Sequence, residues 1–176
     1  VVLRNNHCHD NARWGIFTAY AEGILIEGNI TSFSGIEHGV YVSNSSDNPV
    51  IRRNVVHNNA RSGIQINAVP ALPGDGIISN AVVAENVIYA NGADGAAGIN
   101  LASVTNSLVA NNLLFDNLAT GIAGWDDDFS PAFGTHDNII VFNTVYQASN
   151  GRWALSLLNG SHSNVVRNNV LLHPGT

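Results

Sequence analysis

The chain has 176 residues, of which 45% are hydrophobic and only 11% are charged, and its net charge is −6. All seven basic residues are arginines, so the charge balance argues against binding nucleic acid or an anionic membrane through a basic face. The one cysteine, Cys8, cannot form an intramolecular disulfide, and no apolar run reaches the roughly 18 residues of a membrane-spanning helix.

An asparagine recurs along the chain, each time closing one short apolar segment and preceding the next. The intervals are 23, 25, 32, 26, 31 and 26 residues, which is the range of repeat lengths typical of solenoid proteins. The repeated residues are Asn6, Asn29, Asn54, Asn86, Asn112, Asn143 and Asn169.

Each repeat predicts three short strands separated by turns. In the third copy they cover residues 49–53, 55–58 and 63–67, and no helical periodicity is present. Apolar residues also recur three positions before and two positions after each repeated asparagine, so stacked coils would place like residues above one another. We expect the asparagines to adopt a left-handed backbone conformation at a bend and to pass side-chain hydrogen bonds between coils.

The pattern predicts an all-β chain, a parallel β-helix of about seven coils with three strands per coil. We expect residues 1–176 to form a single domain. The sequence starts inside an apolar strand and contains no methionine. It therefore predicts a piece of a longer chain, with further coils or domains at one or both ends.

The motif N-x-[IV]-x-x-N followed by G-[IV]-x-[IV], as in residues 54–59 and 63–66, resembles the right-handed parallel β-helix superfamily of pectate lyases, alginate lyases and mannuronan epimerases. Residues 37–45 and 151–155 also resemble bacterial right-handed parallel β-helix repeat proteins. The resemblance implies a secreted, periplasmic or cell-surface protein with a polysaccharide or oligosaccharide partner, and no nucleic acid or membrane insertion. Yet the epimerase D-P-H-D motif is missing, and a lysine base is excluded because the chain has no lysine.

In those enzymes the substrate lies on the outer face of one sheet, and the glycine-led strands here offer a matching surface. Their outward positions carry aromatic, amide and hydroxyl side chains, which suit the apolar faces and hydroxyl edges of a sugar. The alternative is the ordinary polar face of a solenoid. The predicted substrate-binding residues are Gln65, Asn67, Asn100 and Trp125, with Asp75 and His136 from the adjoining loops.

Two connections after the glycine-led strands are long, residues 68–80 and 125–138. We expect them to form two walls about 10 Å apart on either side of the fourth coil, with a low floor between them. The second contains the acidic run Asp126, Asp127 and Asp128. These carboxylates could hold Ca²⁺, because hard cations prefer several oxygen ligands; the alternative is a solvated acidic loop.

Glu37 and His38 precede the glycine of the second coil, and Arg13 and Arg61 occupy the Glu37 position in the neighbouring coils. One interpretation is a structural Arg–Glu–Arg stack. In the other, Arg61 neutralises the carboxylate of a uronic acid and His38 or Tyr41 removes the adjacent proton. We expect Arg152 and Trp153 to pack rather than to bind.

The sequence therefore favours a carbohydrate-active protein that acts on a polyuronate, such as pectate or alginate, by β-elimination. The catalytic candidates are His38, Arg61 and Tyr41. Two alternatives remain open: a carbohydrate-binding or cell-surface module without catalysis, and a glycoside hydrolase that uses loop carboxylates such as Asp75 and Asp127.

Overall fold

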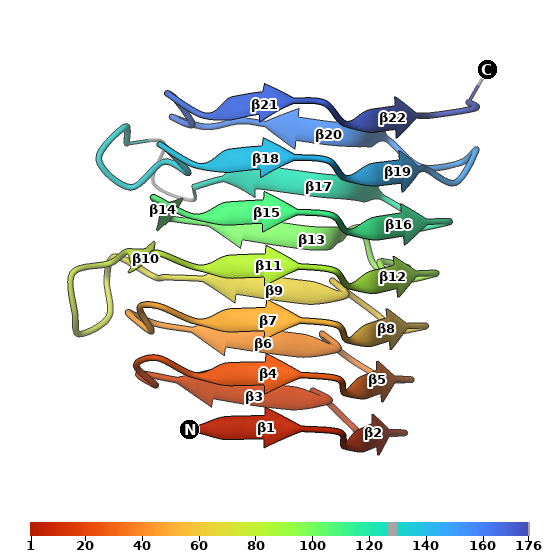
Figure 1. The fold of residues 1–176 in the computed structure, drawn as a ribbon, viewed down its shortest axis with the longest axis horizontal. Coiled ribbons are helices and arrows are strands. Elements are labelled where there is room, and N and C mark those ends of the chain that lie inside the picture. Colours follow the sequence, from red (N-terminus) through yellow and green to blue (C-terminus); the bar gives the residue numbers. More distant parts are fainter. Residues whose placement is uncertain (127–129, 176) are drawn as a thin grey trace.

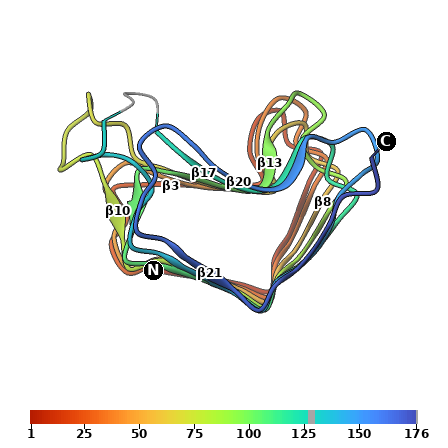
Figure 2. The ribbon, with the colours of Figure 1, turned by 90° about the horizontal axis from the view of Figure 1, so that it is seen from above.

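The computed structural model describes residues 1–126 and 130–175, and within them it contains strands, turns and bends but no helix, hence none that could cross a membrane. The chain winds into stacked coils, and strands pair in parallel with the equivalent strands of the neighbouring coils (Figure 1). Seen along the stack, the sheets enclose a common interior (Figure 2).

Each of the first six coils contributes one strand to each of three long sheets, as the repeat predicts, and the last coil contributes to two of them. The first seven-stranded sheet contains β1 (Val2–Arg4), β4 (Leu25–Glu27), β7 (Val50–Arg52), β11 (Val82–Ala84), β15 (Leu108–Ala110), β18 (Ile139–Val141) and β21 (Val165–Arg167). The second contains β2 (His7–His9), β5 (Ile30–Ser32), β8 (Val55–His57), β12 (Val87–Tyr89), β16 (Leu113–Phe115), β19 (Thr144–Tyr146) and β22 (Val170–Leu172). The six-stranded sheet contains β3 (Ile16–Ala19), β6 (Val40–Ser43), β9 (Ile64–Asn67), β13 (Ala97–Ala102), β17 (Thr120–Trp125) and β20 (Trp153–Leu157). A short pair, β10 (Ile78–Ser79) and β14 (Val104–Thr105), lies between the six-stranded and the first sheet.

Residues at equivalent positions of successive coils form columns that fill the interior. Ile26, Ile51 and Val83 are in register on the first sheet and fully buried, as are Val56 and Ile88 on the second. Both apolar columns predicted from the repeat are therefore confirmed. In the first and last coils these columns are partly exposed, because each of those coils has a neighbour on one side only.

The repeated asparagines form a continuous hydrogen-bonded ladder. The Nδ2 of Asn54 donates to Oδ1 of Asn86 at 3.0 Å, and Asn86 donates in the same way to Asn112 at 3.0 Å. The predicted coil-to-coil bonds are confirmed, but the predicted backbone conformation is wrong. The left-handed residue is the one before each ladder asparagine, such as Arg53 at φ 56° and Glu85 at φ 59°. This turn directs the asparagine side chain inward, where its amide can bridge two coils.

A second ladder, formed by the asparagine that ends the N-x-[IV]-x-x-N motif, stabilises the turn between the second and six-stranded sheets. Asn59 donates to Asn91 at 2.9 Å, and Asn91 donates to Asn117 at 3.1 Å. All three side chains are buried. The turn that leads into the six-stranded sheet is therefore fixed by polar contacts that water does not reach.

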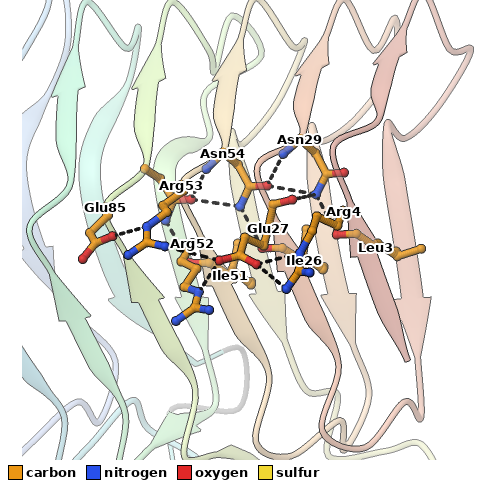
Figure 3. A network of polar contacts seen from close by, with 11 residues as sticks. Leu3, Arg4, Ile26, Glu27, Asn29, Ile51, Arg52, Arg53, Asn54 and Glu85 are labelled. Carbon is orange, nitrogen blue, oxygen red and sulfur yellow. Dashed lines mark hydrogen bonds and ion pairs between the residues drawn. The ribbon is translucent and has the colours of Figure 1, made fainter.

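An ion-pair cluster lies on the outer side of the first sheet (Figure 3). The Glu27 carboxylate accepts hydrogen bonds from the Nε atoms of Arg4 and Arg52, each at 2.8 Å, while Arg53 bridges to Glu85 at 2.6 Å. Burial raises the pKa of Glu27, but the two arginine bonds outweigh it and the net shift is downward. The cluster links the first four coils, and every charged member has a partner.

Gly39 shows why a glycine recurs near the start of most strands of the six-stranded sheet. A Cβ on Gly39 would lie 2.6 Å from both Asn59 Nδ2 and Val56 Cγ1, and 2.9 Å from the Gly63 carbonyl oxygen. We expect Gly39→Ala to lower the free energy of unfolding by about 1–3 kcal/mol, the usual cost of overpacking. Urea denaturation followed by circular dichroism measures the change.

The matched control is Gly35→Ala, where a Cβ would meet nothing closer than 3.6 Å and the backbone is not left-handed. We expect a change within about 0.5 kcal/mol for this variant. Equal effects of the two substitutions would contradict the close-approach explanation.

Candidate functional site

A groove of about 460 Å³ runs over the outer face of the six-stranded sheet. Figure 2 shows loops rising on both sides of this face, so that the strands form the floor between them. The floor carries one outward side chain per coil at the position of Tyr41, and strand pairing aligns these residues in the predicted register. The row is Phe17, Tyr41, Gln65, Asn100, Ala123 and Ser156.

Most of the predicted site residues meet in this groove. Those that line it are His38, Tyr41, Arg61, Gln65, Asn67, Asn100 and Trp125. The indole Nε1 of Trp125 donates to Asn100 Oδ1 at 2.9 Å, and Ser62 donates to Gln65 Oε1 at 2.9 Å. These contacts hold the floor amides in fixed orientations, which suits recognition of hydroxyl groups.

Two predicted substrate-binding residues lie elsewhere. The Asp75 carboxylate accepts hydrogen bonds from Ser45 Oγ at 3.2 Å and from the Ile77 backbone at 3.0 Å, so it stabilises its own loop. The Nδ1 of His136 contacts Asp137 Oδ2 at 2.8 Å, and its ring stacks on His162 at 4.6 Å. Neither Asp75 nor His136 is among the residues that line the groove.

The predicted calcium ligands are divided. Asp126 is fully buried, and its carboxylate accepts the Ser130 N–H at 3.1 Å, which shapes the start of the second long loop. Asp127 and Asp128 lie outside the described residues. Within the described part of the chain, no three His, Cys, Asp or Glu side chains are arranged to hold a metal ion, and Ca²⁺ stays a prediction.

The two long loops do not stand apart as expected. Phe133 of the second loop approaches Gly76 of the first so closely that a Cβ on Gly76 would lie 3.0 Å from the Phe133 ring. The predicted low gap over the fourth coil is therefore wrong, because this aromatic ring bridges it. The two long loops therefore contact each other.

Glu37, His38 and Arg61 lie on the opposite side. The backbones of Arg13, Glu37 and Arg61 are stacked by hydrogen bonds of 3.2 and 2.9 Å, as the sequence indicated. Arg13 Nε lies 3.7 Å from the Glu37 carboxylate. Arg61, however, forms no ion pair with any residue that the structure describes, and it is exposed at the groove. Of the predicted Arg–Glu–Arg stack, only Arg13 and Glu37 form an ion pair, and the Arg61 guanidinium is available to a ligand.

His38 is buried and has a defined tautomer. Its Nδ1 lies 3.1 Å from the Ser62 backbone N–H, which can only donate, so Nδ1 accepts and the proton is on Nε2. Nε2 faces the Glu37 carboxylate at 3.4 Å. Burial lowers the pKa of His38 to about 4, with Glu37 opposing the shift and Arg61 adding to it. The imidazole is neutral at pH 7.

This depressed pKa predicts a pH-dependent stability. Above about pH 6.5 the imidazole is neutral in both states; as pH falls towards 4, only the unfolded chain takes up the proton, so folding is disfavoured. Between pH 7 and pH 5 we expect His38 to account for a loss of about 2 kcal/mol in the free energy of unfolding. Urea titrations of the wild type and of His38→Gln at both pH values measure it.

The glutamine amide can still accept the Ser62 N–H, and the control is His9→Gln at an exposed histidine. We expect His38→Gln to flatten the stability profile and His9→Gln to leave it unchanged. An equally steep profile in His38→Gln would contradict the assignment.

Among the groove residues that the sequence interpretation missed, two stand out. Arg152 and Trp153 line the groove rather than packing away from it, and both are exposed. Trp153 pairs with Thr120 in the six-stranded sheet, which places Arg152 in the same column as Arg61, three coils further on. The sequence could have shown that Arg61 and Arg152 are equivalent, since both stand three residues before the first inward residue of their strand. The altered sixth copy obscured it.

Residues 1–73 match the family profile described as "Right handed beta helix region". The chain is a right-handed parallel β-helix. The resemblance stated from its repeat motif is thereby confirmed at the level of the fold. No curated protein matches the sequence.

Solved structures with the same fold include a mutant of the periplasmic alginate epimerase AlgG, with a TM-score of 0.70 and 21% identity over 97% of this chain. The mannuronan C-5 epimerase AlgE4 A-module of Azotobacter vinelandii has a TM-score of 0.71 and 20% sequence identity over 97% of this chain. The Dettilon tailspike protein has a TM-score of 0.58 and 17% sequence identity over 96% of this chain. The β-helix spans 45%, 53% and 37% of these chains, about half their length or less.

Proposed function

We propose that this β-helix binds an acidic polysaccharide, a polyuronate, along the groove of the six-stranded sheet and removes the C5 proton of one sugar. The observation that carries the proposal is Arg61, a guanidinium at the groove without a carboxylate partner among the described residues. Amides on the floor and the rings of Trp125 and Trp153 provide the polar and apolar contacts that a pyranose requires.

The chemistry follows from the position of the C5 proton beside the uronate carboxylate. Removing it leaves negative charge on that carboxylate, and a guanidinium that forks onto both oxygens stabilises this charge. In β-elimination the base takes the C5 proton, the electron pair forms the C4=C5 double bond, and the C4–O bond breaks. The leaving oxygen then needs a proton, and the Tyr41 hydroxyl at the groove is our proposed donor.

The names of the structural neighbours support a uronate substrate, because AlgG and AlgE4 are epimerases of alginate and mannuronan. Inversion at C5 and β-elimination share the same first step, loss of the C5 proton. We favour elimination, and the two outcomes differ in their products. The periplasmic neighbour also supports the proposal of a secreted, periplasmic or cell-surface location.

A substrate panel in D₂O tests the proposal. The protein is incubated with mannuronate, guluronate and galacturonate oligomers, with and without Ca²⁺, and the products are examined by NMR and ultraviolet absorbance. Elimination predicts an unsaturated uronate, whereas inversion predicts deuterium at C5 without unsaturation. Neither product from any polyuronate would contradict the catalytic part of the proposal.

A further inference from the structure

We infer that the base of this site is Glu37, with His38 and Trp14 as positioning residues that hold its carboxylate. The inference rests on the proposed function, because it assigns the group that takes the C5 proton. It differs from the interpretation of the sequence, in which His38 or Tyr41 is the base.

His38 is poorly placed to accept a proton. A neutral imidazole has one basic nitrogen, and here that nitrogen, Nδ1, already accepts the Ser62 backbone N–H at 3.1 Å in a buried position. Protonating it would break this bond and leave a buried donor without an acceptor, which costs roughly 1–3 kcal/mol. The other nitrogen, Nε2, carries a proton and faces Glu37. His38 therefore presents an N–H, not a basic nitrogen, to the Glu37 carboxylate.

Glu37 has the complementary arrangement. Its Oε2 accepts the indole N–H of Trp14 at 3.2 Å, and His38 Nε2 lies 3.4 Å from the same oxygen, so one hydrogen bond and one close polar contact hold this oxygen. Oε1 has only the longer contact to Arg13, at 3.7 Å. The side chain lines the groove and remains 21% exposed. One carboxylate oxygen is thus held in place, while the other keeps lone pairs for a ligand.

The neighbouring coil supplies Arg61, the positive group that a base in this position needs beside it. Because the Arg61 N–H donates to the Glu37 carbonyl at 2.9 Å, their side chains start from adjacent positions on the same wall. A uronate carboxylate bound by Arg61 would present its α-carbon, C5, towards Glu37. The base and the group that neutralises the substrate charge then act on adjacent atoms, as proton removal beside a carboxylate requires.

The proposed step is balanced. Glu37 takes the C5 proton and becomes a neutral carboxylic acid, and the electron pair moves into the C4=C5 bond as the C4–O bond breaks. The leaving oxygen takes the proton of the Tyr41 hydroxyl, and after the product leaves Glu37 gives its proton to water while Tyr41 regains one from water. No oxidant or other reactant is needed.

The test compares Glu37→Gln and His38→Gln with the wild type. Glutamine at position 37 keeps an oxygen acceptor for Trp14 but cannot take a proton. We expect Glu37→Gln to lower the turnover of uronate oligomers by about 10²-fold or more, the usual contribution of a general base, with little change in oligomer affinity by calorimetry. We expect His38→Gln to lower kcat by less, with KM unchanged. Glu85→Gln, on the outside of the first sheet, is the matched control and should leave turnover unchanged.

If the wild type binds polyuronates, any of three results would overturn the inference. They are Glu37→Gln with turnover close to the wild type, His38→Gln with a larger loss than Glu37→Gln, and a wild type that binds the oligomers without any exchange or elimination at C5. In the last case the groove still binds polyuronates, but Glu37 is not a base. A wild type that binds no polyuronate would overturn the proposed function together with the assignment of Glu37.

Discussion

Replacing Asn86 with alanine is expected to lower the free energy of unfolding by about 3–5 kcal/mol, because the substitution removes four buried hydrogen bonds. The Asn86 amide donates to Asn112 Oδ1 and to the Ile51 carbonyl, both at 3.0 Å. Its Oδ1 accepts the backbone and side-chain N–H groups of Asn54, also at 3.0 Å. Urea or thermal denaturation gives the change.

Alanine cannot replace any of these partners, and the side chain is only 1% exposed, so water cannot reach them. The matched control is Asn150→Ala in an exposed turn after β19, which we expect to change stability by less than about 0.5 kcal/mol. An Asn86→Ala variant as stable as the wild type would contradict a stabilising role for the ladder.

Replacing Arg61 with glutamine is expected to weaken the binding of uronate oligomers by roughly 10- to 100-fold. A hydrogen-bonded contact to a charged group contributes about 1.5–3 kcal/mol, and each 1.4 kcal/mol is a factor of about ten in Kd. Stability should be unaffected, because Arg61 is exposed and forms no ion pair within the described chain. Calorimetric titration measures the affinity.

The control for Arg61 is Arg167→Gln on β21, an exposed arginine on another sheet, for which we expect unchanged affinity. A similar loss in both variants would indicate attraction by overall charge instead of a contact in the groove. Unchanged affinity for Arg61→Gln would remove Arg61 from the site.

The fold could be predicted from the sequence because stacked coils repeat their environment. Ile26, Ile51 and Val83 meet the same neighbours in successive coils, so the same residue type recurs and the period becomes visible. The ladder asparagines recur for the same reason. Which residue of the turn is left-handed could not be read from the pattern. Asn5, Asn111 and Asn168 precede ladder asparagines, so in these copies either residue of the pair could have been assigned that conformation.

The candidate site was predicted in part. The alternation of the strands placed Gln65 and Asn100 on the floor of the groove, because side-chain direction in a strand follows from position alone. Contacts between loops follow no such rule, so the approach of Phe133 to Gly76 was missed. The acceptor role of His38 Nδ1 also depends on a backbone N–H from the next coil, a contact that the sequence does not encode locally.

The most direct test of the account is a calorimetric titration of the wild-type protein with a uronate oligomer and with the same oligomer after reduction of its carboxylates to alcohols. The sugar rings and linkages are the same in both ligands, so the comparison isolates the carboxylates. We predict saturable binding of the acidic oligomer and binding of the reduced one weaker by at least roughly tenfold, as loss of one charged contact implies. Equal binding of the two ligands, or binding of neither, would contradict a groove built to recognise uronate carboxylates.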